Sequence, residues 1–314
     1  MKSFLLKIAI FFVLPILATV LWVLIYGFPP PNLSQNVGFN AKMLSIKNNK
    51  PSAPLDVLAI GSSMSLNNIY SESIATNLGD NYLNFSSWGQ NVEDDYKLIK
   101  IFKKRFKPKM IIMSGNYMDF NKNPKGVKFE SLEEYLADDS KSFYSGMGFR
   151  HFLLEARIFH EDKRAQHSYN NLLFDEHGGV TFPKDNFEIM KLRWDGYRIK
   201  KFVFDSAQYQ YLDSLANFCN ANGIYFSYIQ SPFREGYLAS LEDEERISLA
   251  NHIHKVSTVL KKNNILFVNT TTEVWPDSLY VDYSHFNNIG CKKYTDLFVS
   301  QIKADRASKG IANK

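Results

Sequence analysis

The chain has 314 residues, of which 45% are hydrophobic and 15% aromatic, which is enough for a packed core and excludes a disordered protein. Its formal net charge of +5 is a modest excess for this length and argues against a nucleic-acid-binding protein. The two cysteines, Cys219 and Cys291, are too few for a disulfide framework and lack metal-ligand spacing. We expect both to be small buried apolar residues, with a disulfide between them left open.

The first 28 residues have the pattern of a membrane anchor. Ile8 to Phe28 is a run without charge, which as a helix would be roughly 31 Å long, about one hydrocarbon core. No small-residue cleavage site follows it, so the pattern favours an uncleaved signal anchor over a removed signal peptide. Lys2 and Lys7 predict a cytoplasmic amino end, which places the rest of the chain in the periplasm or on the cell surface. Residues 29–54 are expected to form a linker or a wrapping arm.

From residue 55 onward, apolar strands alternate with helices. The predicted strands cover residues 57–60, 82–86, 110–114, 224–232 and 265–269, and the predicted helices cover 66–78, 92–106, 203–222, 241–262 (capped by Ser240) and 287–304. Five strands separated by helices predict a parallel sheet covered on both faces, a three-layer α/β/α, flavodoxin-like fold.

Residues 117–200 interrupt this alternation. We expect an aromatic-rich insertion there that forms a wall or lid, with a helix at 153–159 and a turn into a short strand at 176–181. The predicted organisation is therefore a membrane helix at 1–28, a linker at 29–54, one domain at 55–306 that contains the insertion, and a tail at 307–314.

Small hydroxyl residues follow the first predicted strand. Gly61 permits a sharp turn, after which Ser62 and Ser63 lie at the strand's carboxyl end, the edge where open α/β sheets bind ligands. A serine at the start of a helix there has an exposed hydroxyl and N–H groups nearby that can stabilise an anion. The alternative is an ordinary polar turn in which Ser65 caps the next helix.

Further polar groups follow later strands. Asp282 stands three residues before His285, just ahead of a helical pattern. A nucleophilic serine needs a base and a group that orients the base, and Asp-x-x-His can supply both from one loop. Asn116 follows the strand at 110–114, and its amide could donate to an oxyanion. Taken alone, His285 could be an ordinary loop histidine.

In this order, these segments resemble the sequence blocks of the SGNH (GDSL-like) hydrolase superfamily. Ser63 matches the nucleophile block, Gly89 the glycine block, Asn116 the Gly-x-Asn block (here Ser114-Gly115-Asn116), and Asp282 and His285 the Asp-x-x-His block. The resemblance implies an SGNH fold over roughly residues 55–306, with residues 117–222 matching nothing recognisable.

The resemblance also implies roles for these residues. Ser63 would be the nucleophile, His285 the general base and Asp282 the group that orients it. The backbone N–H groups of Ser63 and Gly89 and the side-chain amide of Asn116 would form the oxyanion hole, with Gly79 as the alternative to Gly89.

The sequence departs from the usual Gly-Asp-Ser, since Gly61-Ser62-Ser63 lacks the acidic residue. With a single amino-terminal anchor, it resembles the branch that contains the DltD-type proteins of teichoic-acid D-alanylation. That branch implies acyl transfer on a cell-envelope polymer, beside a membrane-bound acyltransferase. We therefore expect an anchored, extracytoplasmic serine esterase or O-acyltransferase that acts on an envelope glycan or polymer.

Two other functions stay open: a small-ester or lipid esterase, and a non-catalytic binding or scaffold protein with the same fold. No metal or nucleotide motif is present in the sequence, and His252 and His254 are too close on one helix to share a metal face. We expect no cofactor and no metal.

Overall fold

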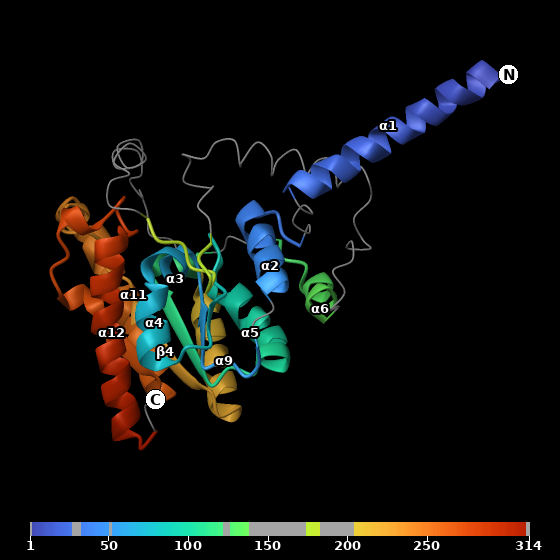
Figure 1. The fold of residues 1–314 in the computed structure, drawn as a ribbon. Helices are drawn as coiled ribbons and strands as arrows, with labels where there is room; N and C mark the ends of the chain where they lie inside the picture. Colours follow the sequence, from blue (N-terminus) through green and yellow to red (C-terminus); the bar gives the residue numbers. More distant parts are fainter. Residues whose placement is uncertain are drawn as a thin grey trace.

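The computed structural model describes residues 2–26, 33–49, 52–121, 126–137, 174–182 and 204–311. At its centre is a sheet with helices around it (Figure 1). The sheet has five parallel strands in the order β2-β1-β3-β4-β5. The strands are β1 (Val57–Ile60), β2 (Tyr82–Asn84), β3 (Met110–Gly115), β4 (Tyr225–Gln230) and β5 (Leu266–Asn269). This is the flavodoxin-like strand order, so the predicted α/β class and parallel sheet are confirmed.

Helices cover both faces of the sheet, as predicted. Alternate side chains of each strand point to opposite faces and create two apolar layers. The helices around the sheet are α3 (Ser63–Asn68), α4 (Ser71–Leu78), α5 (Val92–Phe106), α9 (Ser206–Ala221), α11 (Asp243–Lys262) and α12 (Asn288–Ser308). Leu58, Ile111 and Phe226 face a core shared with α5, α9 and α11. Val57, Ile112 and Val268 face a core shared with α4 and α12.

Shorter elements complete the described part of the chain. They are α6 (Phe129–Ala137), α10 (Glu235–Ala239) and the 3₁₀ helices η1 (Tyr117–Phe120), η3 (Thr270–Thr272) and η4 (Asp277–Leu279). Of the predicted insertion, the helix at 153–159 lies outside the described residues. Residues 176–178 form the expected turn, but instead of a strand, a single bridge joins Phe182 to Asn287.

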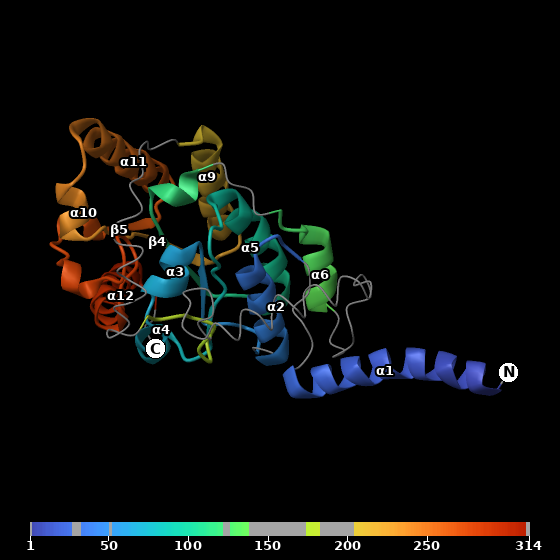
Figure 2. The same cartoon turned by 90° about the horizontal axis from the view of Figure 1, so that it is seen from above.

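Helix α1 (Lys2–Tyr26) extends away from the sheet and its covering helices in both views (Figure 1, Figure 2). Most of the exposed large apolar side chains of the described residues belong to it: Phe4, Ile8, Phe11, Phe12, Val13, Leu14, Ile16, Leu17, Val20, Leu21 and Leu24. Among the described residues, no helix combines the length and the apolar character needed to cross a membrane.

The segment predicted as a linker contains a helix, α2 (Val37–Asn49), that packs on the domain. Phe39, Met43 and Ile46 are buried in the same core as α5 and α9. Lys42 is also fully buried, and its Nζ donates to the carbonyl oxygens of Asn84, at 2.8 Å, and Gly178. Residues 33–49 of this segment therefore contribute to the core of the domain.

The helix predicted at 66–78 is interrupted. Ile69 and Tyr70 have extended backbones, with ψ of 122° and 106°, and they separate α3 from α4. The N–H of Tyr70 donates to Thr295 Oγ1 at 2.8 Å instead of to a helix carbonyl. Tertiary contact with α12 therefore replaces the local helical bond.

Ser240 was predicted to cap a helix, but it ends α10, and α11 begins at Asp243 with Glu242 as its N-cap. A capping box explains the difference, because the N–H of Glu242 donates to Glu245 Oε2 at 2.8 Å. Helix α9 begins later than predicted, after the capping residue Asp205, and α12 continues beyond the predicted domain end at 306. Cys219 and Cys291 are both free and buried.

Candidate active site

The turn after β1 places Ser63 at the first position of α3. Gly61 has φ of +126°, in the region that favours glycine, and a Cβ there would lie 2.8 Å from Ser65 Oγ. Ser62 is the N-cap, since its hydroxyl accepts the N–H of Met64 at 3.2 Å. The Ser63 side chain follows this cap and is nearly buried, with 9% of the residue exposed.

Ser65 is not the cap of this helix. Its hydroxyl donates to the carbonyl of Ser114 at 2.9 Å and accepts the N–H of Ser114 at 2.7 Å. This pair of bonds joins α3 to the end of β3. The nucleophile candidate and Asn116, which follows β3, are therefore held at the same edge of the sheet.

Two hydrogen bonds hold Asn116 in place, one to its side-chain oxygen and one from its backbone N–H. Its Oδ1 accepts the N–H of Met118 at 2.9 Å, and its own N–H donates to Asp119 Oδ2 at 2.9 Å, which together form a capping box for η1. The side chain is fully buried, and among the described residues its Nδ2 has no hydrogen-bond partner. Buried amide donors usually have a partner, so this N–H group is available to an incoming oxygen.

Asp282 and His285 form the predicted pair. Asp282 Oδ2 lies 2.7 Å from His285 Nδ1, and Oδ1 accepts the N–H groups of Ser284 and His285 at 2.9 and 2.7 Å. Burial favours a higher pKa for Asp282, but the charge of His285 and these hydrogen bonds outweigh it and lower the pKa below its usual value. An ionised carboxylate can only accept, so Nδ1 carries the proton and Nε2 is the basic nitrogen.

The loop that carries His285 packs on the helix that carries Ser63. Cys291, in the first turns of α12, contacts the carbonyl of Asn67 through its sulfur at 2.9 Å, and Asn68 contacts the loop itself. Among the described residues, no hydrogen bond joins the Ser63 hydroxyl to His285. Such bonds are often long in structures without substrate.

Gly89 lies in an exposed turn after β2, with φ of +69°. The preceding Ser87 donates its N–H to the carbonyl of Gly61 at 3.1 Å, which fixes this turn beside the start of α3. Gly79 precedes β2 and so lies at the opposite edge of the sheet. Of the two glycines, Gly89 is the one on the same edge as Ser63, and its role as an oxyanion donor stays a prediction.

Two buried carboxyl groups, which no sequence pattern distinguishes, lie behind the Ser63 turn. Asp119 is 3% exposed, and burial raises its pKa to about 7, opposed by hydrogen bonds from the Ser62 hydroxyl and the Asn116 N–H. Burial, followed by repulsion from Asp119, raises the pKa of Asp95 well above its usual value, opposed by the N–H of Gly61. In the sequence, Asp95 was indistinguishable from an ordinary acidic residue in the first turn of a helix.

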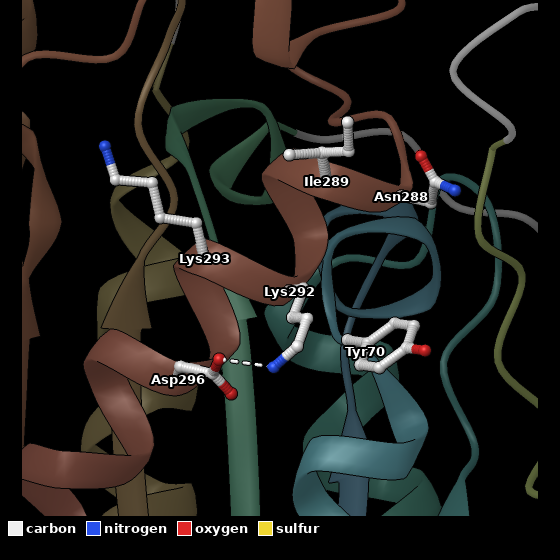
Figure 3. A pocket seen from close by; sticks show the side chains of 6 residues that line it. All are labelled: Tyr70, Asn288, Ile289, Lys292, Lys293 and Asp296. Atoms are coloured by element: carbon white, nitrogen blue, oxygen red, sulfur yellow. Dashed lines mark hydrogen bonds and ion pairs between the residues drawn. The ribbon is translucent and has the colours of Figure 1, made fainter.

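A separate surface pocket of ≈ 410 Å³ lies beside the first turns of α12 (Figure 3). Its lining residues are Tyr70, Asn288, Ile289, Lys292, Lys293 and Asp296. Lys292 is paired with Asp296 at 2.7 Å, and none of the candidate catalytic residues lines this pocket.

The described residues contain no cluster of three or more side chains suited to a metal ion. His252 is instead buried among aromatic rings, where it stacks on Phe204 and its Nδ1 lies 2.9 Å from the hydroxyl of Tyr209. Burial, with a smaller contribution from Lys255, lowers the pKa of His252 to about 3, so it is a neutral core residue.

No protein-family model matches the chain, and no curated protein matches it. Among solved structures, the chain is similar to a GDSL-like lipase from Bacteroides thetaiotaomicron, with 10% identity and a TM-score of 0.42 over 84% of this chain and 97% of that one. It is similar to an acetyl-xylooligosaccharide esterase from Geobacillus, with 14% identity and a TM-score of 0.40 over 80% and 95%. A lipase/acylhydrolase from Enterococcus faecalis has 10% identity and a TM-score of 0.37 over 80% and 97%.

Proposed function

We propose that this protein is a serine esterase or O-acyltransferase that uses Ser63, His285 and Asp282 as a catalytic triad. The observation that carries the proposal is the buried Asp282–His285 pair, which leaves Nε2 as a base on a loop packed against the helix of Ser63. The vacant amide donor of Asn116, at the same edge of the sheet, supports it.

In this mechanism, the Ser63 hydroxyl attacks the ester carbonyl while His285 Nε2 takes its proton. Asp282 stabilises the imidazolium that forms. The negative oxygen of the tetrahedral intermediate accepts hydrogen bonds from Asn116 Nδ2 and from the N–H groups of Ser63 and Gly89. His285 then protonates the leaving alcohol, and the C–O bond breaks to give an acyl-Ser63.

The second half of the reaction resolves this acyl-enzyme. His285 removes a proton from water, which gives a carboxylic acid, or from an acceptor hydroxyl, which gives a new ester. Both outcomes use the same residues. They are distinguished by mass spectrometry of the products when the purified protein is supplied with an acyl ester and an O-deacylated envelope polysaccharide.

The nucleophile is tested with a fluorophosphonate probe, which needs no knowledge of the substrate. We expect the full-length protein in detergent to be modified at Ser63. Labelling should be lost in Ser63→Ala and His285→Ala, and kept in His254→Ala, which alters an exposed histidine on α11. If folded wild-type protein is not labelled, the triad is rejected and the non-catalytic binding protein becomes the better interpretation.

We also propose that α1 holds the protein on the extracytoplasmic side of a membrane, where an envelope glycan or polymer is the substrate and a membrane-bound acyltransferase a partner. The uncharged run from Ile8 to Phe28 and the exposed apolar side chains of α1 support this proposal. We expect the protein to stay in the membrane fraction after alkaline carbonate washing. Release of wild-type protein by that wash would contradict the anchor, and Leu14→Arg with Leu17→Arg should cause such release.

A further inference from the structure

Asn68 is the last residue of α3, five positions after Ser63, and it is fully buried. Its Oδ1 accepts the N–H of Phe286 at 2.9 Å, and its Nδ2 donates to the carbonyl of Ser284 at 3.0 Å. These two backbone groups belong to the residues on either side of His285. A single side-chain amide therefore binds the chain immediately before and immediately after the candidate base.

Both ends of this amide are hydrogen-bonded within the site. The second N–H of Nδ2 donates to Ser231 Oγ at 3.0 Å, and the N–H of Ser231 donates in turn to the carbonyl of Gly115 at 2.8 Å. Gly115 precedes the oxyanion candidate Asn116 in sequence. Because one end of the amide must donate and the other must accept, only one orientation of Asn68 satisfies all three partners.

The bonds between Asp282 and His285 cannot fix the position of the loop, because both residues belong to it. They orient the imidazole relative to its own backbone and leave open where the loop lies relative to α3. Between residues 63–68 and residues 282–286, the hydrogen bonds that the described structure contains are the two made by Asn68.

We propose that Asn68 is a positioning residue that holds His285 in reach of Ser63 by binding both backbone groups that flank it. The inference rests on the proposed function, in which His285 is the general base. No sequence pattern marked Asn68, since an asparagine at the end of a short helix is ordinary and its partners lie 216 and 218 residues away.

Loss of the Asn68 side chain should slow the reaction strongly and leave substrate binding nearly unchanged. Replacing Asn68 by alanine leaves the carbonyl of Ser284 and the N–H of Phe286 buried without their partner, so the loop is expected to shift. A displacement of about 1 Å between catalytic groups can cost about 100-fold in rate. We therefore expect Asn68→Ala to lower the fluorophosphonate labelling rate of Ser63, and kcat for an acyl ester, about 100-fold with little change in KM.

The matched control is the neighbouring Asn67→Ala. Asn67 is equally buried, and its Nδ2 donates to the carbonyl of Val180 at 2.9 Å, so it has a comparable structural bond that does not reach the His285 loop. A purely structural role for Asn68 would slow labelling only as far as the variant loses folding stability, as in Asn67→Ala. Labelling is compared at a temperature where both are folded by circular dichroism.

A second measurement does not depend on catalysis. Hydrogen exchange read by mass spectrometry should show that Asn68→Ala exposes the amide of Phe286, whereas Asn67→Ala leaves it protected. Should Asn68→Ala fail to fold, Asn68→Asp replaces it, because this variant keeps an acceptor for Phe286 while losing both donors. It should retain protection at Phe286 and still label slowly.

These measurements distinguish a failure of the Asn68 proposal from a failure of the proposed function. Slow labelling in the Asn68 variants and not in Asn67→Ala supports the proposal, together with protection at Phe286 that is lost in Asn68→Ala and kept in Asn68→Asp. Wild-type labelling in Asn68→Ala, or equal loss of protection in Asn67→Ala, overturns it. If even the wild type is not labelled, the proposed function fails and the catalytic role of Asn68 with it, while exchange at Phe286 still shows whether Asn68 holds the loop.

Discussion

In the part of the chain that the structure describes, the oxygen of the Asn116 side chain has a hydrogen-bond partner and the nitrogen has none, so substitutions there can separate an effect on the proposed reaction from an effect on folding. Oδ1 caps η1 by accepting the N–H of Met118, whereas Nδ2 is buried with no hydrogen-bond partner among the described residues. Asn116→Ser keeps an oxygen acceptor for the cap and removes the amide donor, and Asn116→Ala removes both. Losing one oxyanion donor typically lowers kcat about 10²–10³-fold, which is about 3–4 kcal/mol. Both variants should show that loss.

The N-cap formed by Asn116 contributes to folding stability and not to the reaction. An N-cap replaced by alanine costs about 1 kcal/mol of stability, so only Asn116→Ala should unfold at clearly lower urea concentration than the wild type. The assay combines kcat and KM for a chromogenic acyl ester with urea unfolding followed by circular dichroism. Wild-type kcat in Asn116→Ser would refute the reasoning, because Nδ2 would then not stabilise the transition state.

Three further predictions concern the surroundings of the site. Gly61→Ala should abolish labelling of Ser63 and lower the unfolding temperature, because the positive φ and the close approach of α3 leave no room for a Cβ. The raised pKa of Asp119 means that the folded state binds its proton more tightly than the unfolded chain, so stability falls as pH rises from about 4 to 7. In Asp119→Asn, the loss of stability over this pH range should be smaller by up to about 4 kcal/mol, at about 1.4 kcal/mol for each pH unit. An equal pH dependence of urea unfolding in the wild type and in Asp119→Asn would contradict this. Lys42→Met leaves the buried carbonyls of Asn84 and Gly178 without their donor, which should cost about 1–3 kcal/mol in urea unfolding, and an unchanged midpoint would show that the bonds contribute nothing.

Elements with complete local signals could be predicted from the sequence. Helix α5 runs from Val92 to Phe106 as expected, because Asn91 caps it, acidic residues fill its first turn and Lys107 ends it in a left-handed conformation. Strand β1 also matches, since a short apolar run followed by a glycine is typical of a buried parallel strand. The alternation of such strands and helices was sufficient to predict the parallel sheet.

Features that depend on contacts between distant segments could not be predicted. The break between α3 and α4 is stabilised by Thr295 of α12, and nothing local at Ile69 or Tyr70 predicts it. Phe39, Met43 and Ile46 of α2 have helical spacing, but only the packed core shows that this segment belongs to the domain. At the candidate site, the sequence marked the residues that we propose for chemical roles. It did not mark Asn68 or Asp119, because their hydrogen-bond partners follow no pattern of spacing.

The packing of the amino-terminal arm also limits how far the domain can move from α1. Helix α1 ends at Tyr26, and Leu33 is already fully buried in the core of the domain. Seven residue steps separate the two, and a fully extended chain covers at most about 3.4 Å per step, or about 24 Å in all. If a membrane holds α1, as we propose, the first core residue of the domain stays within this distance of the end of α1. Any substrate or acceptor would then have to approach the membrane surface closely to reach the candidate site.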